Sequence, residues 1–269
     1  MDIFQAVVLA LLQGFTEFLP VSSSAHLILP SQILGWADQG LAFDVAVHVG
    51  TLVAVMAYFR RELVDMGTGC VTAVTRRSFN HDAQLGLAVM VGVFPAGIIG
   101  ILCDDFIETY LRSLWVIAIT TIGFGLLLWF AHLVGKRSYR GESELDWRYG
   151  ILIGAAQAIA LIPGTSRSGI TITAALLLGF SASTSARFSF LLSVPVILAA
   201  GGLKTLQLIQ SSVTVNWTFI SIGAIVACLS AYLTIRWFLS LLERVGMLPF
   251  VIYRLFLGIF LIVFLTFTG

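Results

Sequence analysis

The chain has 269 residues, of which 58% are apolar and 11% charged, against about 25% charged residues in an average soluble domain. Its mean hydropathy is +0.99. With 15 basic and 14 acidic residues, the chain has too little polar surface for a water-soluble globule, and the composition favours a multi-spanning membrane protein. The net charge of +1 and the lack of a basic tract give no reason to expect a nucleic-acid partner.

Six apolar stretches are long enough to cross roughly 30 Å of hydrocarbon at about 1.5 Å per helical residue. The sequence therefore predicts six transmembrane helices, at about Leu41–Phe59, Gln84–Cys103, Leu114–Val134, Ser185–Gly202, Phe219–Leu239 and Leu248–Phe267.

Two further apolar regions, 3–35 and 150–180, do not fit a simple span. Proline and hydroxyl residues interrupt each one midway, at residues 20–24 and 163–168. Because each half is too short to cross a bilayer alone, each region is expected to be a re-entrant helix hairpin that enters and leaves by one face.

The two hairpins, each followed by three spans, predict an internal repeat of residues 1–135 and 147–269 within one compact membrane domain. Aligning Pro20 with Pro163 places Ser22–Ser24 over Thr165–Arg167. An odd number of crossings separates the hairpins, so the repeats should have inverted topology and the hairpins should enter from opposite faces.

The basic residues predict the orientation in the membrane. One face has only Arg112 and Lys204, with Asp38, Asp104, Asp105 and Glu108 nearby. We expect both termini and hairpin 1 (3–35) on that outer side, and hairpin 2 (150–180) on the inner side. Eleven basic residues belong to the inner face: Arg60, Arg61, Arg76, Arg77, Lys136, Arg137, Arg140, Arg148, Arg187, Arg236 and Arg244.

Hairpin 1 contains a cluster of groups that can take part in chemistry. Gln13 and Glu17 share a helical face, and a carboxylate in an apolar segment is a functional candidate by default. After the break, Ser22–Ser24 can cap the next helix, and Ser23 and His26 are spaced to share its face. A hydroxyl, an imidazole and a carboxylate form a plausible nucleophile, proton carrier and metal or orienting ligand. Capping by the serines and a structural hydrogen bond from Glu17 are the simpler alternatives.

Hairpin 2 supplies the complementary charge. Arg167 lies in the break between Ser166 and Ser168, and Thr171 follows one turn later. A guanidinium, hydroxyls and a helix N-terminus together suit an anionic group, phosphate above all. Since the hairpins should meet near the midplane, a structural salt bridge to Glu17 is the alternative. His48 and Asp44 could line the cavity mouth or simply be solvated at the interface.

At these residues the sequence resembles the bacterial undecaprenyl-diphosphate phosphatases of the bacitracin-resistance family. The family's (E/Q)xxxE motif corresponds to Gln13–Glu17 and runs into Phe18–His26, and its PGxSRSxxT motif corresponds to Pro163–Thr171. The likeness covers essentially the whole chain, including Arg187–Ser193. Two departures are small: Gln13 is an allowed alternative that removes one charge, and Ser24-Ala25 stands where Thr-Gly is common.

The resemblance implies an enzyme of the bacterial inner membrane that removes the terminal phosphate of undecaprenyl diphosphate and so recycles the cell-wall lipid carrier. We expect Ser23 to attack, His26 to handle the proton, Glu17 with Gln13 to hold Mg²⁺ or Ca²⁺, and Arg167 to stabilise the phosphoryl group. Supporting phosphate donors would be Ser22, Ser24, Ser166, Ser168 and Thr171. The site should open toward the outer leaflet, with apolar grooves between spans for the polyprenyl tail.

Two alternatives remain at this stage. Metal-bound water could attack directly, with Ser23 only binding phosphate. Inverted repeats with broken helices also occur in secondary transporters and lipid flippases. The sequence leaves open the oligomeric state, a homodimer included, the preferred metal, the range of isoprenyl chain lengths and any flipping of the product.

Overall fold

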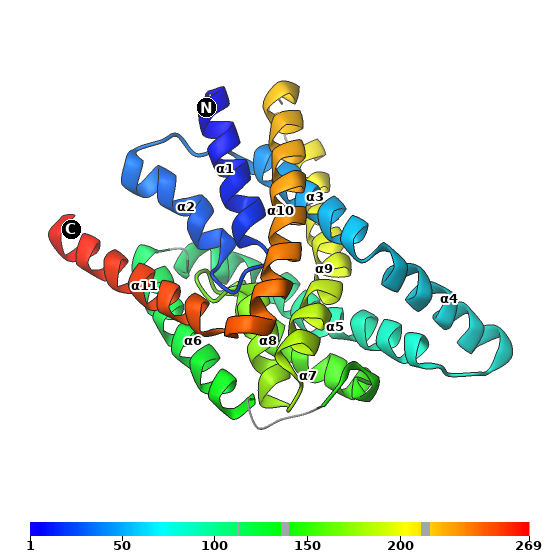
Figure 1. Cartoon of the computed structure of the whole chain (residues 1–269). Helices are drawn as coiled ribbons and strands as arrows, with labels where there is room; N and C mark the ends of the chain where they lie inside the picture. Colours follow the sequence, from blue (N-terminus) through cyan, green and yellow to red (C-terminus); the bar gives the residue numbers. More distant parts are fainter. Residues whose placement is uncertain (112, 136–139, 211–215, 269) are drawn as a thin grey trace.

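The computed structural model describes residues 1–111, 113–135, 140–210 and 216–268. These residues form eleven α-helices and two short 3₁₀ helices (Figure 1). The helices are α1 (Ile3–Thr16), α2 (Ser23–Leu34), α3 (Leu41–Tyr58), α4 (Arg60–Arg76), α5 (His81–Tyr110), α6 (Leu114–Gly135), η1 (Glu142–Glu144), α7 (Trp147–Gln157), η2 (Ala158–Leu161), α8 (Arg167–Leu177), α9 (Ala182–Gln210), α10 (Trp217–Val245) and α11 (Leu248–Thr268).

The all-α membrane fold expected from the sequence is confirmed. Within the described ranges, six helices are long and apolar enough to cross a bilayer: α3, α5, α6, α9, α10 and α11. Each contains most or all of a predicted span. Several charged residues used to orient the chain lie outside the described residues (Arg112, Lys136 and Arg137) or have side chains that are not described (Asp104, Asp105 and Glu108).

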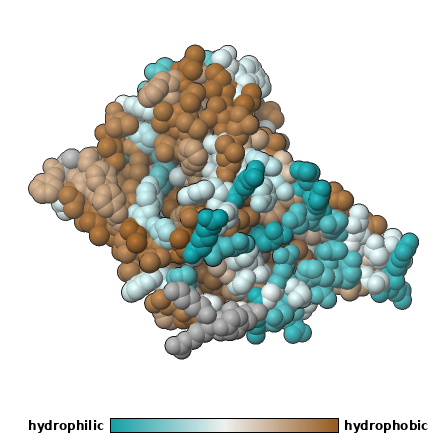
Figure 2. Space-filling view, viewed as in Figure 1, coloured by the Kyte–Doolittle hydropathy of each residue, from teal (hydrophilic) through white to brown (hydrophobic). Residues whose placement is uncertain are grey.

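Helix α4 was not among the expected elements. It begins directly after Phe59, where Arg60, Arg61 and Glu62 end the apolar run of α3. Met66, Gly69 and Ala73, spaced three and four residues apart, are buried on the face that packs against α5. In Figure 2, hydrophilic side chains gather where α4 lies in Figure 1, while most of the rest of this face is hydrophobic.

Both interrupted regions form a helix, a break and a second helix, consistent with re-entrant hairpins. Hairpin 1 comprises α1 and α2, and hairpin 2 comprises α7, η2 and α8. The residues before α2 and α8 are Ser22 and Ser166, whose φ angles of 75° and 73° are rarely adopted by residues other than glycine. These two serines, not Ser22 and Thr165, occupy equivalent positions. The register obtained by aligning the prolines is therefore wrong by one residue.

Each hairpin packs against a span from the other half of the chain. Helix α1 packs on α10, and α7 packs on α5. Glycines allow this close approach: a Cβ on Gly14 would lie 1.9 Å from the Ser230 Oγ, and one on Gly154 would lie 2.1 Å from the Gly92 carbonyl oxygen. The two halves therefore interlock.

Phe18 anchors the turn of hairpin 1 in the core. Its ring is fully buried and meets Phe190 of α9 edge to face, with centroids 5.2 Å apart. Phe190 in turn packs against Phe59 and Phe238. Because Glu17 directly precedes Phe18, this aromatic cluster fixes the position of the carboxylate.

Candidate active site

A cavity of about 730 Å³ begins at the two hairpin breaks. Its polar end is formed by Glu17, Ser22, Ser23, Ser24, His48, Ser166 and Arg167. Its apolar wall includes Leu41, Val45, Ile107, Leu161, Val196, Ile197 and Ala200, and further polar residues are Asp38, Asp44, Lys204 and Gln207. The arrangement offers polar contacts at one end and apolar surface alongside them, which suits an amphiphilic ligand.

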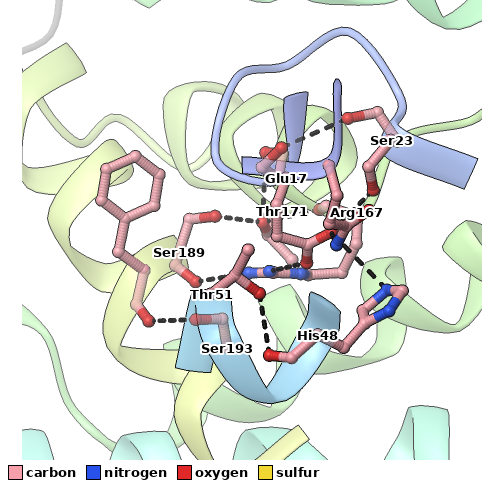
Figure 3. Close-up of polar contacts among 12 residues, drawn as sticks. Glu17, Ser23, His48, Thr51, Arg167, Thr171, Ser189 and Ser193 are labelled. Atoms are coloured by element: carbon pink, nitrogen blue, oxygen red, sulfur yellow. Dashed lines mark hydrogen bonds and ion pairs between the residues drawn. The ribbon is translucent and has the colours of Figure 1, made fainter. Parts of the chain in front are cut away.

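Glu17 and Arg167 meet at the polar end, as the inverted repeat predicted (Figure 3). The Arg167 Nη2 donates to Glu17 Oε1 at 2.7 Å, and the two side chains are only 14% and 7% exposed. Arg167 Nη1 donates to the Ser189 carbonyl of α9 at 3.2 Å, and the guanidinium lies over the Phe18 ring. The two charged groups are therefore held together with little freedom.

The second carboxylate oxygen of Glu17, Oε2, binds Ser23, the candidate nucleophile. Ser23 donates its hydroxyl to Glu17 Oε2 at 2.6 Å, and the Gln13 amide donates to the same atom at 2.9 Å. The His48 Nε2 lies 3.9 Å from it (Figure 3). Ser23 is the first residue of α2, so its hydroxyl stands beside a helix N-terminus and an acceptor for its proton.

The predicted phosphate-binding residues divide into two groups. Ser22, Ser24 and Ser166 line the cavity. Ser168 and Thr171 are buried and are not among the lining residues: the Ser168 hydroxyl donates to the carbonyl of Leu19, and Thr171 bonds the hydroxyl of Ser189 at 2.7 Å. Ser168 joins hairpin 2 to hairpin 1, and Thr171 joins α8 to α9.

The structure does not bring His26 to the Ser23 hydroxyl. The imidazole is 6% exposed; its Nδ1 lies 2.7 Å from the Ser22 carbonyl oxygen, and its Nε2 lies 2.5 Å from the Tyr253 hydroxyl of α11. The rings of His26 and Tyr253 stack. Ser23 and His26 do lie on the same helix, α2. However, the Ser23 hydroxyl turns back to Glu17, whereas the imidazole contacts Ser22 and α11.

Two residues important to the site's geometry went unassigned by sequence reasoning. His48 lines the cavity, whereas the sequence alone did not distinguish a position in the cavity from a solvated position at the membrane interface. Arg254, fully buried in α11, was missed altogether. An arginine inside an apolar span is itself a signal, because an intramembrane charge is costly unless it serves a purpose.

The residues around Glu17 could hold a divalent cation only if a bound phosphate group and water supplied further oxygen donors. In the described ranges, no group of three His, Cys, Asp or Glu side chains has the arrangement of a metal site. However, Gln13 Oε1 is buried and has no hydrogen-bond partner among the described residues. One carboxylate and one amide oxygen, completed by phosphate oxygens and water, make a donor set that Mg²⁺ or Ca²⁺ accepts.

The six long apolar helices define an integral membrane protein, and the two broken helices bring Ser23, Glu17 and Arg167 together between two helix starts. The family model described as bacitracin resistance protein BacA matches residues 6–260, and the chain belongs to this family.

Several curated proteins are similar over nearly the whole chain. A protein of Alcanivorax borkumensis named undecaprenyl-diphosphatase is 62% identical over 98% of this chain and 100% of its own length. Undecaprenyl-diphosphatase 2 of Stutzerimonas stutzeri is 58% identical, covering 98% of each chain. Undecaprenyl-diphosphatase 1 of Pseudoalteromonas translucida is 55% identical over 99% of this chain and 100% of its own.

Proposed function

We propose that the chain hydrolyses undecaprenyl diphosphate to undecaprenyl phosphate and inorganic phosphate in the bacterial cytoplasmic membrane. The names of the relatives support this substrate, and the family supports this class of reaction. The observation that carries the proposal is the cluster of Ser23, Glu17 and Arg167 at the end of an amphiphilic cavity.

The geometry supports Ser23 as the nucleophile. Its oxygen attacks the terminal phosphorus, its proton passes to Glu17 Oε2, and the bond from phosphorus to the bridging oxygen breaks. Undecaprenyl phosphate leaves with the bridging oxygen, and the terminal phosphoryl group remains on Ser23. Water then attacks this phosphoserine, the bond from phosphorus to the Ser23 oxygen breaks, and the proton held on Glu17 returns to that oxygen as inorganic phosphate leaves.

Arg167 and the starts of α2 and α8 supply the positive potential that phosphoryl transfer needs. The guanidinium already lies at the carboxylate that accepts the proton, and Ser22, Ser24 and Ser166 offer hydroxyls to phosphate oxygens. Donors fixed before the substrate arrives stabilise developing charge without reorganisation.

A divalent cation, Mg²⁺ or Ca²⁺, is part of the proposal. Glu17 and the Gln13 amide oxygen would hold it, and it would neutralise charge on the diphosphate.

The roles of His26 and of attacking water stay open to test. His26 remains a proposed proton carrier from the sequence, although its ring contacts the site through the Ser22 carbonyl. Rapid acid quenching of single-turnover reactions distinguishes the routes: recovered phosphoserine at position 23 supports serine attack. No phosphoserine, together with an active Ser23→Thr variant, would favour direct attack by water.

We also propose that the cavity opens to the outer leaflet and that both termini lie outside. Asp38 and Lys204, which the basic-residue bias assigned to the outer side, line this cavity. Ile107, near the C-terminal end of α5, also lines it. The diphosphate would enter from that side while the polyprenyl tail stays along the apolar wall.

Phosphate release in detergent micelles tests the proposal against lipid transport, because micelles have no two compartments. Purified protein should release one phosphate per undecaprenyl diphosphate, and the Ser23→Ala variant should not. Purified, folded protein that releases no phosphate under any cation condition would contradict the proposal and leave transport as the alternative.

A further inference from the structure

Arg254 of α11 binds the backbone of both hairpin breaks. It is fully buried, and its Nη1 donates to the carbonyls of Pro20 at 3.2 Å and Thr165 at 2.9 Å. Its Nη2 donates to the Gly164 carbonyl at 2.9 Å, and its Nε donates to the Thr121 carbonyl of α6 at 3.1 Å. One side chain therefore links two breaks that are 144 residues apart along the chain, as measured from Ser22 to Ser166.

Tyr253, next to Arg254, and Thr120 of α6, the last span of the first half, also contact the hairpins. Tyr253, next to Arg254, bonds His26 of α2 and stacks on its ring. In α6, which packs against α11, the Thr120 hydroxyl donates to the Pro163 carbonyl at 2.7 Å. The proline carbonyl of each break is thus bound by a side chain of the last span in the other half of the chain.

The carbonyls that Arg254 binds in the breaks lie one or two residues before the serines with positive φ. Pro20 lies two residues before Ser22, and Thr165 immediately precedes Ser166. Such a backbone conformation persists only where the surroundings hold it, and an exposed carbonyl within the membrane needs a donor. Arg254 supplies donors at both places, and its hydrogen bonds go to backbone carbonyls, not to the cavity residues Glu17, Ser23 or Arg167.

We propose that Arg254 is a positioning residue that holds the two breaks in register, so that Ser23 and Glu17 of one hairpin face Arg167 of the other. Tyr253 and Thr120 each support one hairpin. The inference about turnover rests on the proposed function, whereas the inference about the breaks rests on the contacts alone. Because a displacement of about 1 Å can cost about 100-fold in rate, loss of this residue acts mainly on kcat.

The test combines kinetics with hydrogen exchange of the purified protein in lipid nanodiscs. Arg254→Met should lower kcat for phosphate release about 100-fold and change KM less than threefold. Exchange should rise at least about 10-fold in peptides covering 17–25 and 160–169, since bonds to a charged donor are lost. Arg236→Met, at an exposed position of α10, is the matched control and should leave exchange in both breaks unchanged.

Milder variants keep the proposal testable if Arg254→Met does not fold. Thr120→Val should raise exchange only at 160–169, and Tyr253→Phe only at 17–34. Arg254→Lys, which keeps the charge but not the forked geometry, should raise exchange in both breaks less than Arg254→Met.

Two results would overturn the positioning role: unchanged exchange in both breaks of a folded Arg254 variant, or an equal rise throughout the described helices. The failure of the proposed function has a different signature, because wild-type protein would then release no phosphate while the exchange pattern still reported on the breaks.

Discussion

Replacing Arg167 by alanine tests the central contact of the site. In the structure, its guanidinium lies 2.7 Å from Glu17, and both side chains are largely buried. Removing one partner of a buried ion pair costs about 3–5 kcal/mol, because the other charge is left uncompensated. An arginine that stabilises a transferring phosphoryl group contributes about 10³–10⁵ in rate. We therefore expect Arg167→Ala to lower turnover at least about 1000-fold, which corresponds to about 4 kcal/mol.

The assay is inorganic phosphate release from undecaprenyl diphosphate in micelles, with folding checked by size exclusion and thermal unfolding. The double variant Glu17→Gln, Arg167→Met removes both charges and separates a structural pair from a catalytic one. It should recover stability relative to Arg167→Ala but not activity. Recovery of more than a tenth of the wild-type rate in either variant would refute the catalytic reasoning and leave the ion pair as structural.

Three further predictions concern other parts of the molecule. Gly154→Val should lower the free energy of unfolding by at least about 3 kcal/mol, because its Cβ would lie 2.1 Å from the Gly92 carbonyl oxygen. A lower unfolding temperature would report this loss. Gly123→Ala, with open space around the Cβ, is its control and should change little. Ser23→Ala should fold normally and lose turnover at least about 100-fold, because no hydroxyl remains to bond Glu17 and attack phosphorus; wild-type turnover would exclude serine attack. Chelation of divalent cations should abolish phosphate release without unfolding the protein, and full activity in excess chelator would remove the cation from the proposal.

The fold was largely predictable because hydropathy reports span length directly. Six spans followed from the 30 Å thickness of a bilayer, and the breaks at Pro20 and Pro163 followed from interrupted apolar runs. Even the meeting of Glu17 with Arg167 could be predicted, because inverted hairpins place their tips near one plane. Helix α4 was overlooked because its buried face is small and its polar face resembles a loop.

The finer geometry of the site was less accessible from sequence. The direction of the His26 ring depends on Tyr253, a residue 227 positions away, which a local helical pattern does not reveal. The one-residue shift between the hairpins depends on the backbone conformation of Ser22 and Ser166, which a match of prolines overlooks. These features arise from tertiary contacts, not from local periodicity.

The interlocking of the hairpins has a consequence for how the protein is made. Helix α1 emerges from the ribosome long before α10, the span on which it packs, and Glu17 is synthesised 150 residues before Arg167. During biogenesis the acidic side chain is therefore synthesised before its cationic partner, and α11, whose Arg254 binds both breaks, follows the other described helices along the chain. A chain truncated before α11 lacks the donors that Arg254 gives to both breaks, so these contacts form only after α11 has been synthesised.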